Sequence, residues 1–199
     1  MQISASMVKE LRDRTGAGMM DCKKALIETE GNVDKALDFL RKSGIAKAEK
    51  KVDRKVKEGV IYTYIHPGNK LGALVEINCE TDFVANTDNF MNFVKDIAMQ
   101  VAASAPTAVT REEISTELIE KEKNIYLEQA KKEGKPEHIA EKMVTGRIEK
   151  FFKETVLLEQ PFIKDPDKNI ETHLKETIGK LGENITITRF SRFALGESF

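Results

Sequence analysis

The chain has 199 residues, of which 33% are charged, and 32 Lys and Arg side chains almost balance 33 Asp and Glu side chains. The resulting net charge of −1 argues against binding to nucleic acids or anionic membranes through bulk charge. Binding through a local basic patch is still compatible with this charge. No apolar run approaches the roughly 18 residues of a membrane helix, and Met1-Gln2-Ile3-Ser4 does not look like a signal peptide, so a cytoplasmic protein is expected.

Three short helices are predicted within residues 1–44, where apolar side chains recur at helical spacing. Breakers at residues 15–18 and at Gly31-Asn32 separate the helices, and Gly44 is the expected end of the third. The apolar side of the second helix is expected to hold Met19, Cys22, Leu26 and Ile27. A core of this size is marginally stable, and small bundles of this kind usually serve as binding modules.

Met19 and Met20 are adjacent, so helical geometry places their side chains about 100° apart and they cannot both point inward. The exposed methionine is either a loosely packed gap-filler or a contact residue for a partner, since methionine adapts well to binding surfaces. Lys23, beside them, is interpreted most simply as part of a solvated face.

Residues 45–58 have the composition of a charged linker. Lysine and arginine outnumber the acidic residues there, but the two signs are interspersed and the stretch contains no aromatic residue. A solvated hinge is therefore favoured over a basic arm that touches nucleic acid.

A β-hairpin is predicted after the linker. Alternating apolar residues indicate strands at residues 59–65 and 71–79, and His66-Pro67-Gly68-Asn69 is a strong turn signal between them. Helical spacing then predicts a core-facing helix from Thr87 or Asp88 to about Ser104.

The run Thr81-Asp82-Phe83-Val84-Ala85-Asn86 connects this hairpin to that helix. Its polar residues are typical of caps and turns, whereas Phe83 and Val84 are exceptions to the pattern. One interpretation is that the two apolar side chains fold back as a staple against the new helix. The other is that they form a protruding tip for a partner. The pattern alone leaves both open.

The remaining chain is predicted to complete an α+β core domain at residues 59–199, with a small antiparallel sheet packed by helices. Thr110 and Glu113 suggest a capping box for a long charged helix to about Lys132, and Gly134-Lys135-Pro136 then turns the chain into a second helix. These segments predict a helical hairpin at about residues 110–155. A last short helix at 170–181 and a last strand at 184–190, which could join the hairpin sheet, complete the domain.

Catalysis has little support in the sequence. The histidines at 66, 138 and 173 are far apart, and Cys22 and Cys79 lack the spacing of metal ligands, so buried inert thiols are favoured. The GxxxxGK[ST] pattern of a phosphate-binding loop does not occur. We therefore expect no enzyme activity, no metal and no cofactor.

Several motifs nevertheless resemble the bacterial elongation factor Ts family. They are Val8 to Arg12, Thr15 to Leu26, Asn78 to Asn86, Val101 to Ser104, Gly134 to Pro136, Ile139 to Val144 and Gln160 to Phe162. These motifs extend from the first helices to the last third of the chain in the family's order, which makes the resemblance specific.

The resemblance implies a guanine-nucleotide exchange factor that binds elongation factor Tu in its GDP-bound and nucleotide-free states. The amino-terminal bundle would be ubiquitin-associated-like and would dock on the partner's GTPase domain. Thr81, Asp82, Phe83 and Val84 would dislocate the partner's Mg²⁺, with Phe83 as the wedge. Other matching positions are expected to contact the partner: Arg12, Met19, Met20, Lys23, Ala85 and Asn86.

The chain resembles the short form of the family, because longer members carry a core of two similar halves and a further helical module. A half-core leaves sheet and apolar surface uncovered, so a homodimer is expected, with the final strand as the candidate contact. Two other functions stay open. A protein-binding adaptor would bind a GTPase without changing nucleotide release, and an RNA-binding factor would show a salt-sensitive RNA affinity.

Overall fold

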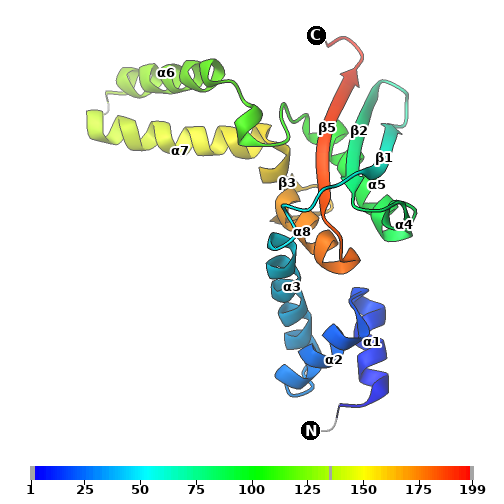
Figure 1. The fold of residues 1–199 in the computed structure, drawn as a ribbon. Helices are drawn as coiled ribbons and strands as arrows, with labels where there is room; N and C mark the ends of the chain where they lie inside the picture. The colour runs from blue at the N-terminus through cyan, green and yellow to red at the C-terminus, as the bar shows by residue number, and fades with distance from the viewer. Residues whose placement is uncertain (1–2, 135, 198–199) are drawn as a thin grey trace. The chain divides into compact units, whose positions relative to one another are not determined.

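The computed structural model describes residues 3–134 and 136–197, so Lys135 of the expected helical turn lies outside the described residues. The fold is α+β, as predicted (Figure 1). The chain divides into two compact units. The first contains the residues up to Tyr62, Val75–Asp96 and Thr172–Thr188, and the second contains Thr63–Leu74, Ile97–Glu171 and the residues from Arg189 onward.

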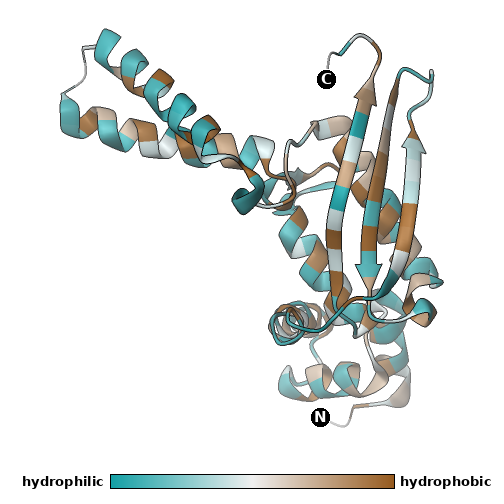
Figure 2. Cartoon of the chain, turned by 45° about the horizontal axis from the view of Figure 1, so that its top comes forward, coloured by the Kyte–Doolittle hydropathy of each residue, from teal (hydrophilic) through white to brown (hydrophobic). Residues whose placement is uncertain are grey.

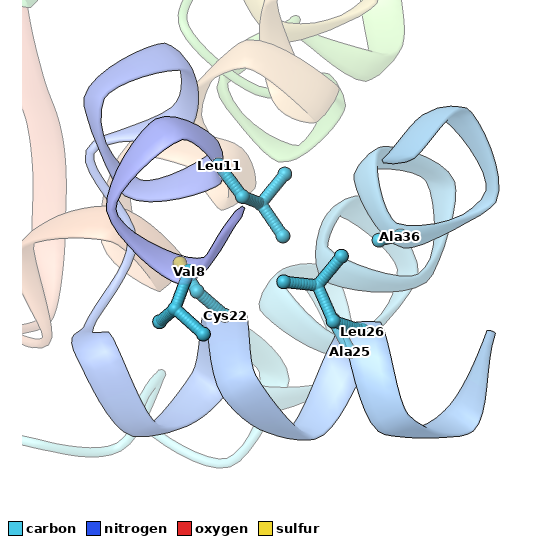
Figure 3. Packing of buried hydrophobic residues seen from close by; sticks show 6 residues of the cluster. All are labelled: Val8, Leu11, Cys22, Ala25, Leu26 and Ala36. Carbon is cyan, nitrogen blue, oxygen red and sulfur yellow. The ribbon is translucent and has the colours of Figure 1, made fainter. Parts of the chain in front are cut away.

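The first unit begins with a three-helix bundle of α1 (Ala5–Thr15), α2 (Met19–Glu28) and α3 (Val33–Glu49). Ser4 Oγ accepts a hydrogen bond from the Met7 amide at 3.3 Å, and Asn32 Oδ1 accepts one from the Lys35 amide at 3.0 Å, so Ser4 caps α1 and Asn32 caps α3. Leu11 and Leu26 point into the space between the helices (Figure 3). The remaining buried members of this core are Val8, Cys22, Ala25 and Ala36.

The third helix does not end at Gly44, as the sequence had suggested, but continues to Glu49. Gly44 is not among the glycines with positive φ, and Ala46 to Glu49 are good helix formers, so the helix has no reason to stop there. A glycine at this place permits close packing instead. In the first unit, Gly44 lies against Gly179 of α8 (Ile170–Leu181).

This contact makes a prediction about two matched substitutions. A methyl group added at Gly179 would lie 2.7 Å from Gly44 Cα, whereas one added at Gly44 would lie 3.9 Å from Gly179 Cα. Gly179→Ala should lower the free energy of unfolding by about 1–3 kcal/mol. Gly44→Ala should raise it by about 0.5–1 kcal/mol, because alanine is the better helix former. Urea unfolding of both variants measures the difference, and equal midpoints would contradict the close contact.

The sheet has strand order β1-β2-β5, formed by β1 (Glu58–Ile65), β2 (Leu71–Cys79) and β5 (Ile185–Ala194). Positive φ at Gly68 and Asn69 closes the predicted hairpin turn. In the first unit the Thr188 hydroxyl donates a hydrogen bond to Asn78 Oδ1, and in the second the Leu195 amide donates one to the Lys70 carbonyl. Later residues of β5 thus lie beside earlier residues of the hairpin, so β5 runs antiparallel to β2. Figure 2 shows apolar and polar residues alternating along the strands.

The helix α5 (Asp88–Ser104) follows the hairpin, as the spacing predicted. Its buried residues include Phe90, Phe93, Ile97 and Val101. Its buried Gln100 belongs to the second unit and donates from Nε2 to Gln160 Oε1 at 3.2 Å. Gln160 precedes a short antiparallel pair, β3 (Pro161–Phe162) and β4 (Asp165–Asn169), which the sequence did not predict.

The predicted helical hairpin is formed in the second unit by α6 (Thr116–Lys132) and α7 (Glu137–Thr155). Its first helix starts later than expected, because Ser115 caps it and Glu113 accepts a hydrogen bond from the Val109 amide instead of serving a capping box. Thr110 instead precedes the short 3-10 helix η1 (Arg111–Glu113).

Arg111 binds Glu159 and Glu149, which raise the pKa of its guanidinium, and it lies 4.4 Å from the centre of the Phe152 ring. The base of the hairpin is thus held by charge and by aromatic contact.

Among the described residues, no helix combines the length and the apolar character that a membrane span requires.

Candidate functional site

The run at residues 81–86 forms a one-turn helix, α4 (Asp82–Ala85), directly after β2. The apolar residues of β2 alternate and bury Ala73, Val75, Ile77 and Cys79. The last residue of the strand, Cys79, is therefore packed in the core. Thr81 has an extended backbone, and its hydroxyl oxygen accepts a hydrogen bond from the Val84 amide at 3.4 Å. Thr81 is therefore the N-cap, and the exposed Asp82 occupies the first helical position.

Phe83 projects from this turn with 83% of its surface exposed. Helical geometry explains the projection, because Ala85 is only 6% exposed and residues two positions apart point about 200° away from each other. Val84 lies between the two directions and is half-buried. The staple interpretation is therefore wrong for Phe83, which does not fold back on α5. A large apolar side chain exposed to this extent on an ordered turn suits contact with a partner.

The turn is ordered at both ends by side chains. Asn86 Nδ2 donates to the Asp82 carbonyl at 2.9 Å, and Thr87 Oγ1 donates to the Val84 carbonyl at 2.8 Å while accepting from the Phe90 amide at 3.2 Å. Thr87 thus joins α4 to the start of α5. Cys79 lies beneath, where burial and then the charge of Glu183 raise the pKa of its thiol to about 11.

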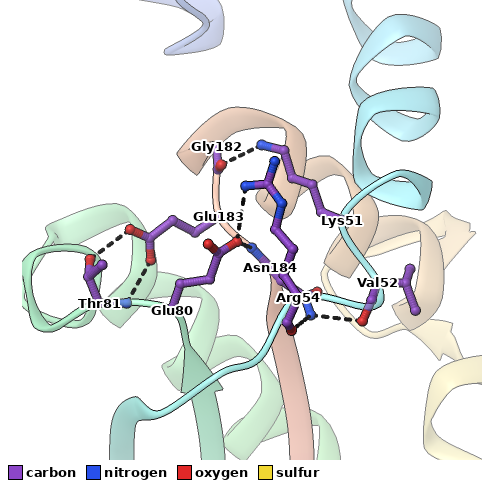
Figure 4. Close-up of polar contacts among 8 residues, drawn as sticks. All are labelled: Lys51, Val52, Arg54, Glu80, Thr81, Gly182, Glu183 and Asn184. Atoms are coloured by element: carbon purple, nitrogen blue, oxygen red, sulfur yellow. Dashed lines mark hydrogen bonds and ion pairs between the residues drawn. The ribbon is translucent and has the colours of Figure 1, made fainter.

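A group of polar residues from distant parts of the first unit lies on one side of the start of α4 (Figure 4). We call it the anchor cluster; its members are Arg54, Glu80, Thr81, Glu183 and Asn184. Glu183 accepts two hydrogen bonds from Thr81, and Glu80 Oε1 accepts one from the Asn184 amide at 2.7 Å. Arg54 Nη1 lies 3.4 Å from Glu80 Oε1. The cluster holds segments that are more than 100 residues apart in the chain.

The anchor cluster also changes the view of the charged stretch at 45–58. Residues 45–49 belong to α3, and the chain after it is held by Asn184 Nδ2, which donates to the carbonyls of Val52 at 3.1 Å and Arg54 at 2.9 Å. Lys51 Nζ donates to the Gly182 carbonyl. In the first unit this part of the stretch is therefore fixed to the 182–184 loop, and a freely solvated hinge does not describe it. The anchor cluster could not be predicted from the sequence, because its residues are far apart in the chain and no local pattern connects them.

The other predicted contact residues lie on the bundle, apart from Ala85 and Asn86. Arg12 and Lys23 are exposed, and Met19 and Met20 are 45% and 73% exposed, so both methionines reach the surface. Ile27 was expected in the core but is 55% exposed, one heptad after Met20 on the same helix. Asn86 is exposed, whereas the buried Ala85 supports α4 from inside and offers no surface.

Comparison with known proteins gives one consistent result. The family described as elongation factor TS matches residues 44–197. The chain is 60% identical over 196 residues to "Elongation factor Ts" of Desulforamulus reducens, covering 98% of this chain and 90% of that protein. It is 59% identical over 195 residues to the protein of the same name from Syntrophomonas wolfei, covering 98% and 91%. For that of Geobacter sulfurreducens the identity is 56% over 197 residues, covering 99% and 91%.

This match extends through α4, the sheet and the helical hairpin, and the relatives extend it across the bundle. The chain therefore belongs to the elongation factor Ts family and is a nucleotide exchange factor of translation elongation, with elongation factor Tu as its binding partner.

Proposed function

We propose that the factor releases GDP from elongation factor Tu by inserting Phe83 near the Mg²⁺ of the partner's nucleotide site. The observation that carries this proposal is the 83% exposure of a phenylalanine on an ordered one-turn helix. Mg²⁺ demands near-ideal octahedral geometry and is held in nucleotide sites by few protein ligands, so a small shift of those ligands weakens its binding. A wedge needs only to produce that shift.

The neighbouring residues then have separate roles. Thr81 caps α4 and Val84 flanks the wedge, while Asp82 contributes its exposed carboxylate. Arg12, Met19, Met20 and Lys23 on the bundle, together with Asn86, contact the partner. We propose that the bundle is ubiquitin-associated-like and docks on the partner's GTPase domain, so that it aims the wedge. The factor needs no catalytic residue of its own, because it changes only the affinity of the partner for nucleotide.

Thermodynamic linkage sets the requirement for this mechanism. An exchange factor that weakens GDP binding to its partner must itself bind the empty partner more tightly than the GDP-bound partner. The two ratios of affinities are equal. GTP in excess then displaces the factor and completes the cycle.

The release of a fluorescent GDP analogue from elongation factor Tu tests the proposal. The factor should accelerate release strongly in millimolar Mg²⁺, and the acceleration should shrink when excess EDTA removes the ion beforehand, because there is then no ion for the wedge to dislocate. Stopped-flow measurements in both buffers give the two ratios. Binding without acceleration would indicate the adaptor function, and an equal acceleration in both buffers would place the effect away from the Mg²⁺.

We also propose that the factor is a homodimer that binds two partner molecules. In the second unit, a groove of about 520 Å³ lies where β1 and β5 end and β2 begins, and it is lined by Ile65, Leu74, Phe193 and Leu195. These side chains are 59%, 39%, 54% and 79% exposed. Since β1 and β5 are edge strands and the patch is apolar, a second copy related by two-fold symmetry could cover it with the same patch. The final strand is the contact in this proposal, as the sequence suggested.

Two further proposals follow from the same role. The factor contacts no nucleic acid directly, because the net charge is only −1 and the charged stretch at 45–58 is partly engaged in the anchor cluster. It acts in the cytoplasm, where translation elongation takes place.

A further inference from the structure

The helix α4 is too short to fix the direction of Phe83 by itself. It has four residues, and a single helical turn is unfavourable in isolation because nucleation orders several residues for one hydrogen bond. Phe83 is 83% exposed and so contributes little packing to hold it. Asn86 and Thr87 hold the far end of the turn, so the direction in which α4 leaves β2 is set at its near end by the contacts of its cap, Thr81.

Glu183 makes two contacts to that cap. Its Oε2 accepts a hydrogen bond from the Thr81 amide at 3.0 Å, and its Oε1 accepts one from the Thr81 hydroxyl at 2.6 Å. A hydroxyl has one proton and two lone pairs. Because the proton is directed at Glu183, a lone pair is free to accept from the Val84 amide. The carboxylate thus fixes both the backbone of Thr81 and the rotation of the hydroxyl that caps α4.

Glu183 is itself held firmly. It follows Gly182, whose φ of 82° is the left-handed conformation that ends α8, and whose carbonyl accepts from Lys51. On its other side, the buried Asn184 donates its amide to Glu80, the residue before Thr81. Two consecutive residues of one loop therefore bind two consecutive residues of the other, each pair through a carboxylate (Figure 4). A paired arrangement of this kind restricts rotation as well as distance.

We propose that Glu183 is a positioning residue of the exchange reaction, which aims Phe83 by holding the cap of α4. The inference rests on the proposed role of Phe83 as the wedge. Glu183 does not contact the nucleotide or its ion in this proposal. It determines how often the free factor already presents Phe83 in the direction that the partner requires.

Glu183→Gln tests this in the full chain. An amide has one acceptor oxygen and its NH₂ group can only donate, so the Thr81 amide and the Thr81 hydroxyl can no longer both donate to residue 183, and at least one of the two charge-assisted hydrogen bonds is lost. Loss of one charge-assisted hydrogen bond should lower the maximal acceleration of GDP release about tenfold. The factor concentration that gives half of the maximum should change less than about twofold, because the bundle still docks. Glu49→Gln, a carboxylate in α3 that lies 3.8 Å from Lys175, is the matched control and should leave release unchanged.

A double-mutant cycle with Phe83→Ala separates positioning from general stability. If Glu183 acts through Phe83, then Glu183→Gln should cost nothing further once Phe83→Ala is present. An equal loss in both backgrounds, or wild-type release with Glu183→Gln alone, would overturn the inference. A Phe83→Ala variant as active as the wild type would overturn the wedge itself, and this result does not involve Glu183.

A second pair of variants leaves Glu183 intact and guards against misfolding. Thr81→Ser keeps the hydroxyl and should retain most of the acceleration, whereas Thr81→Val keeps the shape but loses the hydroxyl proton and the cap. The valine variant should fall by about the same factor as Glu183→Gln. Equal activity of the serine and valine variants would count against the inference.

Discussion

Replacing Phe83 by alanine should slow factor-stimulated GDP release about 30-fold without lowering the stability of the factor. The first effect follows because an aromatic anchor buried in an interface commonly contributes about 2 kcal/mol or more. The second follows because Phe83 is 83% exposed in the free factor, so its removal leaves no cavity. Stopped-flow release and a thermal unfolding scan measure the two effects on the same preparation.

The matched control is Ile163→Ala, which removes another exposed apolar side chain, 41% exposed, that belongs to no proposed contact. It should release GDP at the wild-type rate. Phe83→Leu should lie between the wild type and Phe83→Ala, since it keeps apolar volume but not the aromatic shape. Wild-type release by Phe83→Ala would refute the wedge, while exchange itself would still need an explanation elsewhere on the factor.

Placing a charge in the groove of the second unit should convert the proposed homodimer into monomers. Phe193→Asp would bury an unpaired carboxylate in the two-fold interface twice, once from each copy, and burial of an uncompensated charge costs several kcal/mol. Light scattering at micromolar concentration should give twice the chain mass of 22.4 kDa for the wild type and the chain mass itself for the variant.

Asn124→Asp is the control for this experiment, because it adds the same charge at an exposed position of α6. It should remain dimeric. A wild-type factor that is monomeric at micromolar concentration would refute the dimer. A dimeric Phe193→Asp variant would place the interface away from the end of β5.

Much of the fold follows from local pattern. The strand at 71–79 and the helices at about 88–104 and at 170–181 were predicted to within about a residue of their bounds, because apolar residues there repeat with the period of the element. The start of α6 was predicted at the wrong residue. The capping box at Thr110 and the cap at Ser115 are similar signals, and only the contact of Glu113 with Val109 decides between them.

The site was predictable only in its contiguous part. The run from Thr81 to Asn86 could be singled out because Phe83 breaks its own local pattern. The sequence could not tell whether the Phe83 side chain points toward α5 or toward solvent, since a helical turn with either orientation is compatible with the same residues. The burial of Ala85 settles that direction. Glu183 lies 102 residues from Thr81, and nothing in the neighbourhood of either residue indicates their contact.

The two buried cysteines have a practical consequence for observing the tip. Burial raises the pKa of the Cys79 thiol to about 11, so Cys79 is almost entirely protonated at neutral pH, and Cys22 is fully buried in the bundle. Maleimide dyes react with exposed thiolates, so the unmodified factor should label very slowly. An Asn89→Cys variant would then carry a single reactive thiol on the exposed first turn of α5, next to α4 in the chain, and its fluorescence could report partner binding with Phe83 and both native cysteines in place.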